Sequence, residues 1–269
     1  AAERLGAPPL AKQQLLFLGA GEAGIGIGDL VVEALKHTGV PEAAARQQCW
    51  FVDSQGLVVR GRSSLAPHKV AYAHDYPALA TLLEAVETLR PTALIGVSGM
   101  PQTFTEPVIR AMARINKRPI IFALSNPTSQ AECTAEQAYT WSEGRAIFAS
   151  GSPFAPVTLN GITHVPGQGN NSYIFPGVGL GVIASDSSRV TDEMFYVAAR
   201  TLASLVTEED LKVGRIYPDL RRIRSVSAAI GAAVANVAFQ RGLTRLARPE
   251  KLDEFVRDAM YDPHYVNYV

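Results

Sequence analysis

The stretch of sequence that decides the fold runs Leu15-Leu16-Phe17-Leu18-Gly19-Ala20-Gly21-Glu22-Ala23-Gly24. Its first four residues are apolar and end at a glycine-rich turn, which predicts a short buried strand. The residues after the turn predict a helix whose buried face carries Ile27, Leu30, Val31, Ala34 and Leu35. A buried strand, a G-x-G-x-x-G turn and a helix in this order are typical of a dinucleotide-binding unit.

Strands and helices continue to alternate after this unit. Apolar runs at 49–52, 93–97, 120–124 and 146–149 predict further strands, and a helix is expected over 77–89. Continuous apolar strands alternating with helices favour a parallel sheet covered on both faces. We therefore expect an α/β fold with a doubly wound, Rossmann-like parallel sheet.

The strand pattern stops near residue 175. Helices are then predicted over 176–186, 192–205, 221–241 and 249–260, and the glycine-rich segment 160–181 is expected to be an ordered loop. We divide the chain into a dinucleotide-binding domain, residues 1–170, and a helical C-terminal segment, residues 171–269.

Composition argues against some function classes. The 269 residues include 25 basic and 25 acidic side chains, and a net charge of zero argues against nucleic-acid or membrane-surface binding driven by bulk charge. No apolar run reaches about 18 residues, so no membrane span is expected. Cys49 and Cys133 lack metal-ligand spacing and are expected to be buried free thiols in a reducing compartment. We expect a cytoplasmic protein, with an organelle as the alternative.

The glycine turn predicts a site for the pyrophosphate of a dinucleotide cofactor. Gly19 permits the tight turn, Gly21 lets the backbone approach the phosphates, and Gly24 lets the helix pack against the strand. The helix presents free N–H groups and the positive end of its dipole to the phosphates. The predicted pyrophosphate site consists of Gly19, Ala20, Gly21, Glu22, Ala23 and Gly24.

The residues after the second strand bear on the choice between NAD and NADP. Asp53 is placed to bind the adenosine ribose, and a lone aspartate favours a free 2′-hydroxyl. Ser54 follows it, and three cations lie within the next sixteen residues: Arg60, Arg62 and Lys69. Those side chains could hold a 2′-phosphate by charge-assisted hydrogen bonds. Spacing alone leaves both cofactors open.

Later strand ends should line the same site, because ligands bind outside the carboxyl ends of the strands in open α/β sheets. We expect Val97, Ser98 and Gly99 there, together with Asn126, whose amide can both donate and accept. Asn170 and Asn171 form a second polar cluster. No residue is a convincing general base; of the histidines, His164 is expected nearest the site, in a structural role.

Five blocks of sequence together resemble malic enzymes. The likeness runs in register from about residue 10 to the C-terminus. The blocks are Phe17–Gly24, Val52–Leu57, Leu124–Thr128, Glu132–Tyr139 and Gln168–Gly177.

The resemblance implies oxidative decarboxylation of L-malate to pyruvate and CO2, with reduction of NADP or NAD and with Mg2+ or Mn2+. It implies that Glu22 and Ala23 bind the pyrophosphate, and that Asn126 lies beside the nicotinamide and the substrate. Asn170 and Asn171 would contact the malate carboxylates. Ser54 and Lys69 stand where NADP-preferring members carry a serine and a lysine for the 2′-phosphate, which favours NADP.

The likeness also implies what this chain lacks. The family's catalytic tyrosine and lysine, its malate-binding arginine and its three acidic metal ligands all precede the glycine turn, and the eighteen residues before Gly19 contain no matching motif. We therefore expect no catalytic residue and no metal ligand here, and no turnover by this chain alone. The C-terminal segment would pack on the missing half, and the whole enzyme is expected to be a homo-oligomer. Two alternatives stay open, a non-catalytic NADP-sensing or scaffolding module and an NAD-linked malolactic relative.

Overall fold

The computed structural model describes residues 1–261. The chain forms two compact units, which are described separately. The first consists of Ala1–Gly169 and Val206–Tyr217, and the second of Asn170–Leu205 and the chain from Pro218 onward. Val206–Tyr217 falls in the range assigned to the helical segment from the sequence, but it packs with the first unit, where the N–H of Val165 donates to the carbonyl oxygen of Val213 at 2.8 Å.

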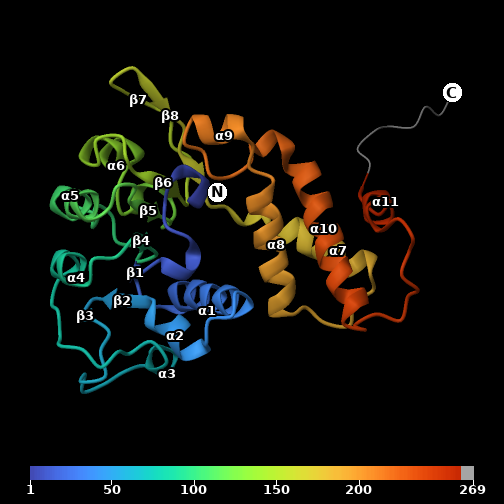
Figure 1. Cartoon of the computed structure of the whole chain (residues 1–269), viewed down its shortest axis with the longest axis horizontal. Helices are drawn as coiled ribbons and strands as arrows, with labels where there is room; N and C mark the ends of the chain where they lie inside the picture. Colours follow the sequence, from blue (N-terminus) through green and yellow to red (C-terminus); the bar gives the residue numbers. More distant parts are fainter. Residues whose placement is uncertain (262–269) are drawn as a thin grey trace. The chain divides into compact units, whose positions relative to one another are not determined.

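The first unit is built on a seven-stranded sheet with the order β3-β2-β1-β4-β5-β6-β9 (Figure 1). All neighbouring strands are parallel except β2 and β3, which form an antiparallel pair. Five strands were predicted from apolar runs: β1 (Leu15–Leu18), β2 (Cys49–Asp53), β4 (Ala93–Gly96), β5 (Ile120–Ala123) and β6 (Ile147–Ser150). The short edge strands β3 (Gly56–Leu57) and β9 (Gly167–Gln168) and the hairpin β7 (Val157–Leu159) with β8 (Ile162–His164) were not predicted. The predicted doubly wound α/β fold is confirmed.

Alternate strand residues point to opposite faces of this sheet. Helices cover both faces, so the side chains on each face are buried. Leu16 and Leu18 pack in one core with α4 (Leu82–Leu89), α5 (Glu106–Ile115) and α6 (Ala135–Trp141). Leu15 and Phe17 pack in the other with α1 (Glu22–His37) and α2 (Glu42–Gln47). Figure 1 shows these two sets of helices on opposite faces. The unit also contains the short helices α3 (Pro67–Val70) and α9 (Glu208–Lys212).

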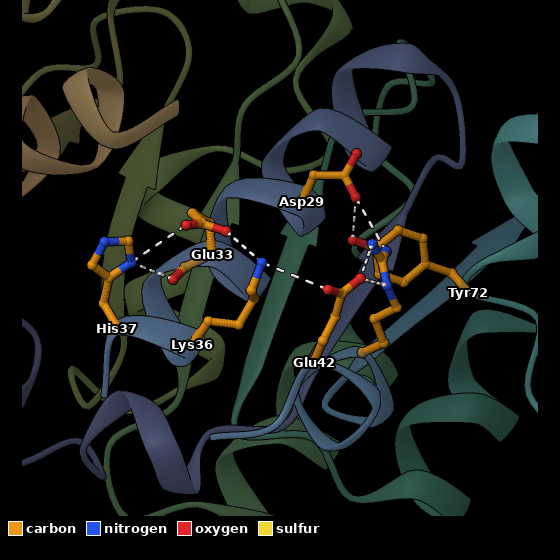
Figure 2. A network of polar contacts seen from close by, with 7 residues as sticks. Asp29, Glu33, Lys36, His37, Glu42 and Tyr72 are labelled. Carbon is orange, nitrogen blue, oxygen red and sulfur yellow. Dashed lines mark hydrogen bonds and ion pairs between the residues drawn. The ribbon is translucent and has the colours of Figure 1, made fainter. Parts of the chain in front are cut away.

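A network of polar contacts fixes α1 against α2 and the segment after α3 (Figure 2). The Tyr72 hydroxyl donates to Asp29 at 2.7 Å, and the Arg46 guanidinium lies 5.1 Å from the centre of the Tyr72 ring. Arg46 also donates to Asp29 and to Glu42. A Cβ on Gly28 would be 3.2 Å from the Tyr72 oxygen, so this glycine lets the helix approach the ring. The network continues through Lys36 to Glu33 and His37. It anchors the helix that begins at the glycine turn.

The second unit is helical. Its elements are α7 (Phe175–Ala184), α8 (Asp192–Ser204), α10 (Ile223–Gln240) and α11 (Leu252–Asp258), which lie at the four predicted helices. Val226, Ile230 and Val234 of α10 are fully buried, because this helix packs against α7, α8 and α11. Within residues 1–261 one helical stretch, 220–240, is long and apolar enough to cross a membrane, but half of its apolar window is buried inside the structure. A core helix of a soluble protein has the same length and composition.

Candidate cofactor-binding site

The glycine turn is tightly packed on its inner side. Gly19 has a φ of +111°, and a Cβ there would lie 2.6 Å from the carbonyl oxygen of Val97. A Cβ on Gly24 would lie 2.4 Å from the carbonyl oxygen of Gly19. Only glycine fits at these two positions, because the obstructing atoms are backbone atoms that cannot rotate away. The turn is thereby held between the ends of β1 and β4.

The outer side of the turn is open. Gly21 precedes α1 in an extended conformation, forms no side-chain cap, and has no atom within 4 Å of the position of a Cβ. The first N–H groups of a helix have no acceptor within it, and here they belong to Glu22, Ala23 and Gly24. Glu22 and Ala23 are exposed, whereas Ala20 is buried. Free N–H groups, a positive dipole end and an uncovered backbone fit a pyrophosphate.

His68 contacts this turn. Its Nε2 lies 3.1 Å from the carbonyl oxygen of Ala20, and its Nδ1 lies 3.7 Å from the Glu22 carboxylate. His164, expected from the sequence to be nearest the site, stacks instead on the buried Tyr139 ring with 4.5 Å between the ring centres. His68 lies more than forty residues after the turn, and no local motif links the two.

Asp53, at the end of β2, is paired with two cations. Arg62 donates to both carboxylate oxygens at 2.9 and 3.0 Å, and Lys69 donates to Oδ2 at 2.7 Å. Ser54 is exposed beside them. Arg60 is directed elsewhere and donates to the carbonyl oxygen of Ala73. Of the three cations considered from the sequence, two therefore meet at the aspartate.

The pairing determines the charge at the end of β2. Burial by itself would raise the pKa of Asp53, but the hydrogen bonds from Arg62 and Lys69 outweigh it and lower the pKa to about 2. The carboxylate is therefore ionised at neutral pH. Two cations around one anion leave one net positive charge, which suits a phosphate.

The ends of β4 and β5 are joined by hydrogen bonds. Ser98 follows β4, and the N–H of Gly99 donates to the Ser125 hydroxyl after β5 at 2.9 Å. Both serine hydroxyls donate to Glu132, a buried residue for which no role at the site was predicted. Val97 is half-buried, and its N–H donates to Leu18 at the end of β1.

Asn126 is exposed at the end of the loop after β5, and its side chain is oriented by a serine. Its Oδ1 accepts a hydrogen bond from the Ser152 hydroxyl at 2.7 Å. A Cβ on Gly151 would lie 2.8 Å from Nδ2 of Asn126, so this glycine makes room for the amide. Nδ2 donates to the carbonyl oxygen of Leu124 at 3.5 Å, and its second N–H suits a carboxylate or carbonyl oxygen.

Comparison with known proteins gives the family. The family described as "Malic enzyme, NAD binding domain" matches residues 1–239. This chain belongs to the malic enzyme family. An "NADP-dependent malic enzyme, chloroplastic" of Zea mays is 53% identical over 262 residues, which cover 96% of this chain and 41% of the relative. "NADP-dependent malic enzyme 2" of Arabidopsis thaliana is 51% identical over 271 residues, with coverage of 100% and 46%.

Solved malic enzymes share the fold. A malic enzyme from Entamoeba histolytica superposes with a TM-score of 0.73 at 21% identity, over 96% of this chain and 50% of the other. One from Pyrococcus horikoshii superposes with a TM-score of 0.67 at 23% identity, over 93% and 54%. The chain thus spans about half the length of the malic enzymes that it matches. Neither alternative considered from the sequence, the non-catalytic module or the malolactic enzyme, is supported by these matches.

Two predicted malate ligands belong to the helical unit of this malic enzyme chain. Asn170 Oδ1 accepts from the N–H of Ser172 at 2.9 Å, which caps the short turn before α7. Asn171 lines an apolar hollow of about 500 Å³ with Phe175 and Phe195. Within residues 1–261 no group of three or more His, Cys, Asp or Glu side chains is arranged to hold a metal ion.

Proposed function

We propose that this chain is the NADP-binding portion of an enzyme that oxidises L-malate and decarboxylates it to pyruvate and CO2. Its family and the names of its relatives support this reaction. The observation that carries the choice of NADP is the pairing of Asp53 with both Arg62 and Lys69. A lone aspartate would repel a 2′-phosphate, whereas the pair of cations offsets that repulsion.

Each predicted cofactor ligand then has a task. The turn from Gly19 to Gly24 binds the pyrophosphate through backbone N–H groups. Ser54 and Lys69 bind the 2′-phosphate, while Arg62 keeps Asp53 neutralised. NADP, when bound, supplies the acceptor for the malate hydride. Val97, Ser98 and Gly99 line the other half of the cofactor site, at the end of β4.

Substrate contacts complete the proposal. Asn126 binds malate and the nicotinamide carboxamide through its side-chain amide, and Asn170 and Asn171 bind the malate carboxylates. We propose no catalytic residue in this chain and place the acid, the base and the ligands of Mg2+ or Mn2+ in other parts of the whole protein. The whole enzyme is proposed to be a homo-oligomer in the cytoplasm or in an organelle; several relatives are named chloroplastic.

The full-length protein tests this function. Incubated with L-malate, NADP and Mn2+, it is expected to form NADPH and pyruvate in equal amounts. Lactate as the product would point to malolactic chemistry, and reduction of NAD in preference to NADP would contradict the assignment of Lys69. The chain of 269 residues, assayed in parallel, is expected to form no NADPH; malate-dependent turnover by it would contradict the placement of the catalytic groups elsewhere.

A further inference from the structure

A fully buried carboxylate lies beneath the ends of β4 and β5. Glu132 is 0% exposed. Its Oε1 accepts hydrogen bonds from the N–H and the hydroxyl of Ser98, both at 3.0 Å, and from the Ser125 hydroxyl at 2.5 Å. Its Oε2 accepts from the N–H of Ser125 at 3.3 Å. A Cβ on Gly96 would lie 2.4 Å from Cδ of Glu132, so the carboxylate rests directly on the last residue of β4.

All four contacts of the Glu132 side chain come from hydrogen-bond donors. The Ser98 hydroxyl accepts from the N–H of Met100 at 3.1 Å, and the Ser125 hydroxyl accepts from the N–H of Gly99 at 2.9 Å. A serine hydroxyl has one proton, which in both residues is directed to Glu132. All four hydrogen bonds at the side chain are therefore donated to its two oxygens, an arrangement that favours a carboxylate. Within residues 1–261 these contacts include no lysine, arginine or histidine, so no ion pair offsets the charge.

The sheet places this charge at one half of the cofactor site. The strand order puts β2 on one side of β1, and β4 with β5 on the other. A dinucleotide lies across the carboxyl ends of these strands, with its adenosine ribose at the end of β2. Asp53 marks that end, so the nicotinamide half lies over the loops that Glu132 joins. This step rests on the proposed function.

We propose that Glu132 is a positioning residue whose buried negative charge makes the site favour the cationic nicotinamide of oxidised NADP over a neutral ring. The reason is electrostatic: a charge interacts more strongly across a low-dielectric interior than across water. The four donors hold the carboxylate in place without supplying a counterion. The same contacts hold the side chains of Ser98 and Ser125 in place at the site.

The test compares NADP with its benzamide analogue, in which a neutral aromatic ring replaces the cationic nicotinamide. Calorimetric titration of the chain is expected to show at least threefold tighter binding of NADP than of the analogue. In the neutral variant Glu132→Gln the preference should disappear. The matched control is Glu136→Gln, which removes an exposed carboxylate four residues away and should leave the preference intact.

Binding of 2′,5′-ADP, which has no nicotinamide, separates the possible outcomes. It should be equal in wild type and Glu132→Gln, because the adenosine end is remote from Glu132. A Glu132→Gln variant that retains the wild-type preference, or weakens all three ligands equally, overturns the proposal. If that variant does not fold, the wild type decides, since equal affinity for NADP and the analogue overturns it too. Failure of the wild type to bind 2′,5′-ADP or NADP would instead contradict the proposed function.

Discussion

The Nζ atom of Lys69 lies 2.7 Å from Oδ2 of Asp53. An aspartate after the second strand of a doubly wound sheet ordinarily favours NAD, because it accepts hydrogen bonds from both ribose hydroxyls. Here Arg62 already binds both oxygens of that aspartate. The carboxylate is thereby neutralised, and Lys69 has two further protons with which to bind a 2′-phosphate.

Replacing Lys69 by alanine should weaken NADP binding about tenfold or more and change NAD binding little. The expected size follows from the loss of a hydrogen bond between charged groups, about 1.5–3 kcal/mol. Titration calorimetry with each cofactor measures the difference. Arg60→Ala is the matched control, because Arg60 is directed to the carbonyl oxygen of Ala73 and should affect neither cofactor. Equal losses for NADP and NAD in Lys69→Ala would argue against a 2′-phosphate contact.

Two glycines of α1 should respond in opposite ways to alanine. A Cβ on Gly24 would lie 2.4 Å from the Gly19 carbonyl oxygen, whereas one on Gly26 would meet no atom within 4 Å. Gly24→Ala should destabilise the fold by about 1–3 kcal/mol, as overpacking does, and abolish NADP binding. Gly26→Ala should stabilise the helix by about 0.5–1 kcal/mol. Urea denaturation and NADP titration of both variants check this; unchanged NADP affinity in Gly24→Ala would contradict it.

The ion pairs of Asp53 predict a dependence of stability on pH. The pKa of Asp53 is lowered to about 2 in the folded protein, below its ordinary value of 3.8. Its stabilisation is therefore complete above the ordinary value and is lost as the pH falls through about 2. Asp53→Asn should melt at a lower temperature than wild type at pH 7, and this difference should shrink between pH 4 and pH 2. A difference that stays constant down to pH 2 would rule out a paired carboxylate.

The helical unit leaves large apolar side chains uncovered. The exposed fractions are 66% for Phe175, 79% for Ile183 and 42% for Phe195. Exposed apolar surface of this kind promotes association. In analytical ultracentrifugation the wild-type chain should self-associate as its concentration rises, and the double variant Phe175→Ser with Ile183→Ser should do so less. A double variant that associates as strongly as wild type would show that these side chains are not the contact.

The elements that depend on a local pattern of residues could be predicted from the sequence. The strands β1, β2, β4, β5 and β6 are short runs of buried apolar residues between turns, and such runs predict strands directly. Other elements were missed or misplaced. The edge strand β9 has only two residues, so no periodicity marks it, and the predicted helix over 77–89 begins later, at Leu82, after the Thr81 cap.

At the site, the turn could be predicted because all six of its residues are contiguous. The sequence placed three cations near Asp53. Only their positions in space show that Arg62 and Lys69 pair with its carboxylate. Glu132 begins one of the blocks that resemble malic enzymes, but its contacts could not be predicted, because its partners Ser98 and Ser125 follow two different strands, β4 and β5. Contacts brought together by the sheet are not visible in any one stretch of sequence.

The most direct test of the central claim is calorimetric titration of this chain with NADP and, separately, with NAD. NADP is expected to bind to one site per chain and at least tenfold more tightly than NAD. Absence of binding by either cofactor would contradict the cofactor site at the glycine turn, and tenfold tighter binding of NAD would contradict the role given to Lys69.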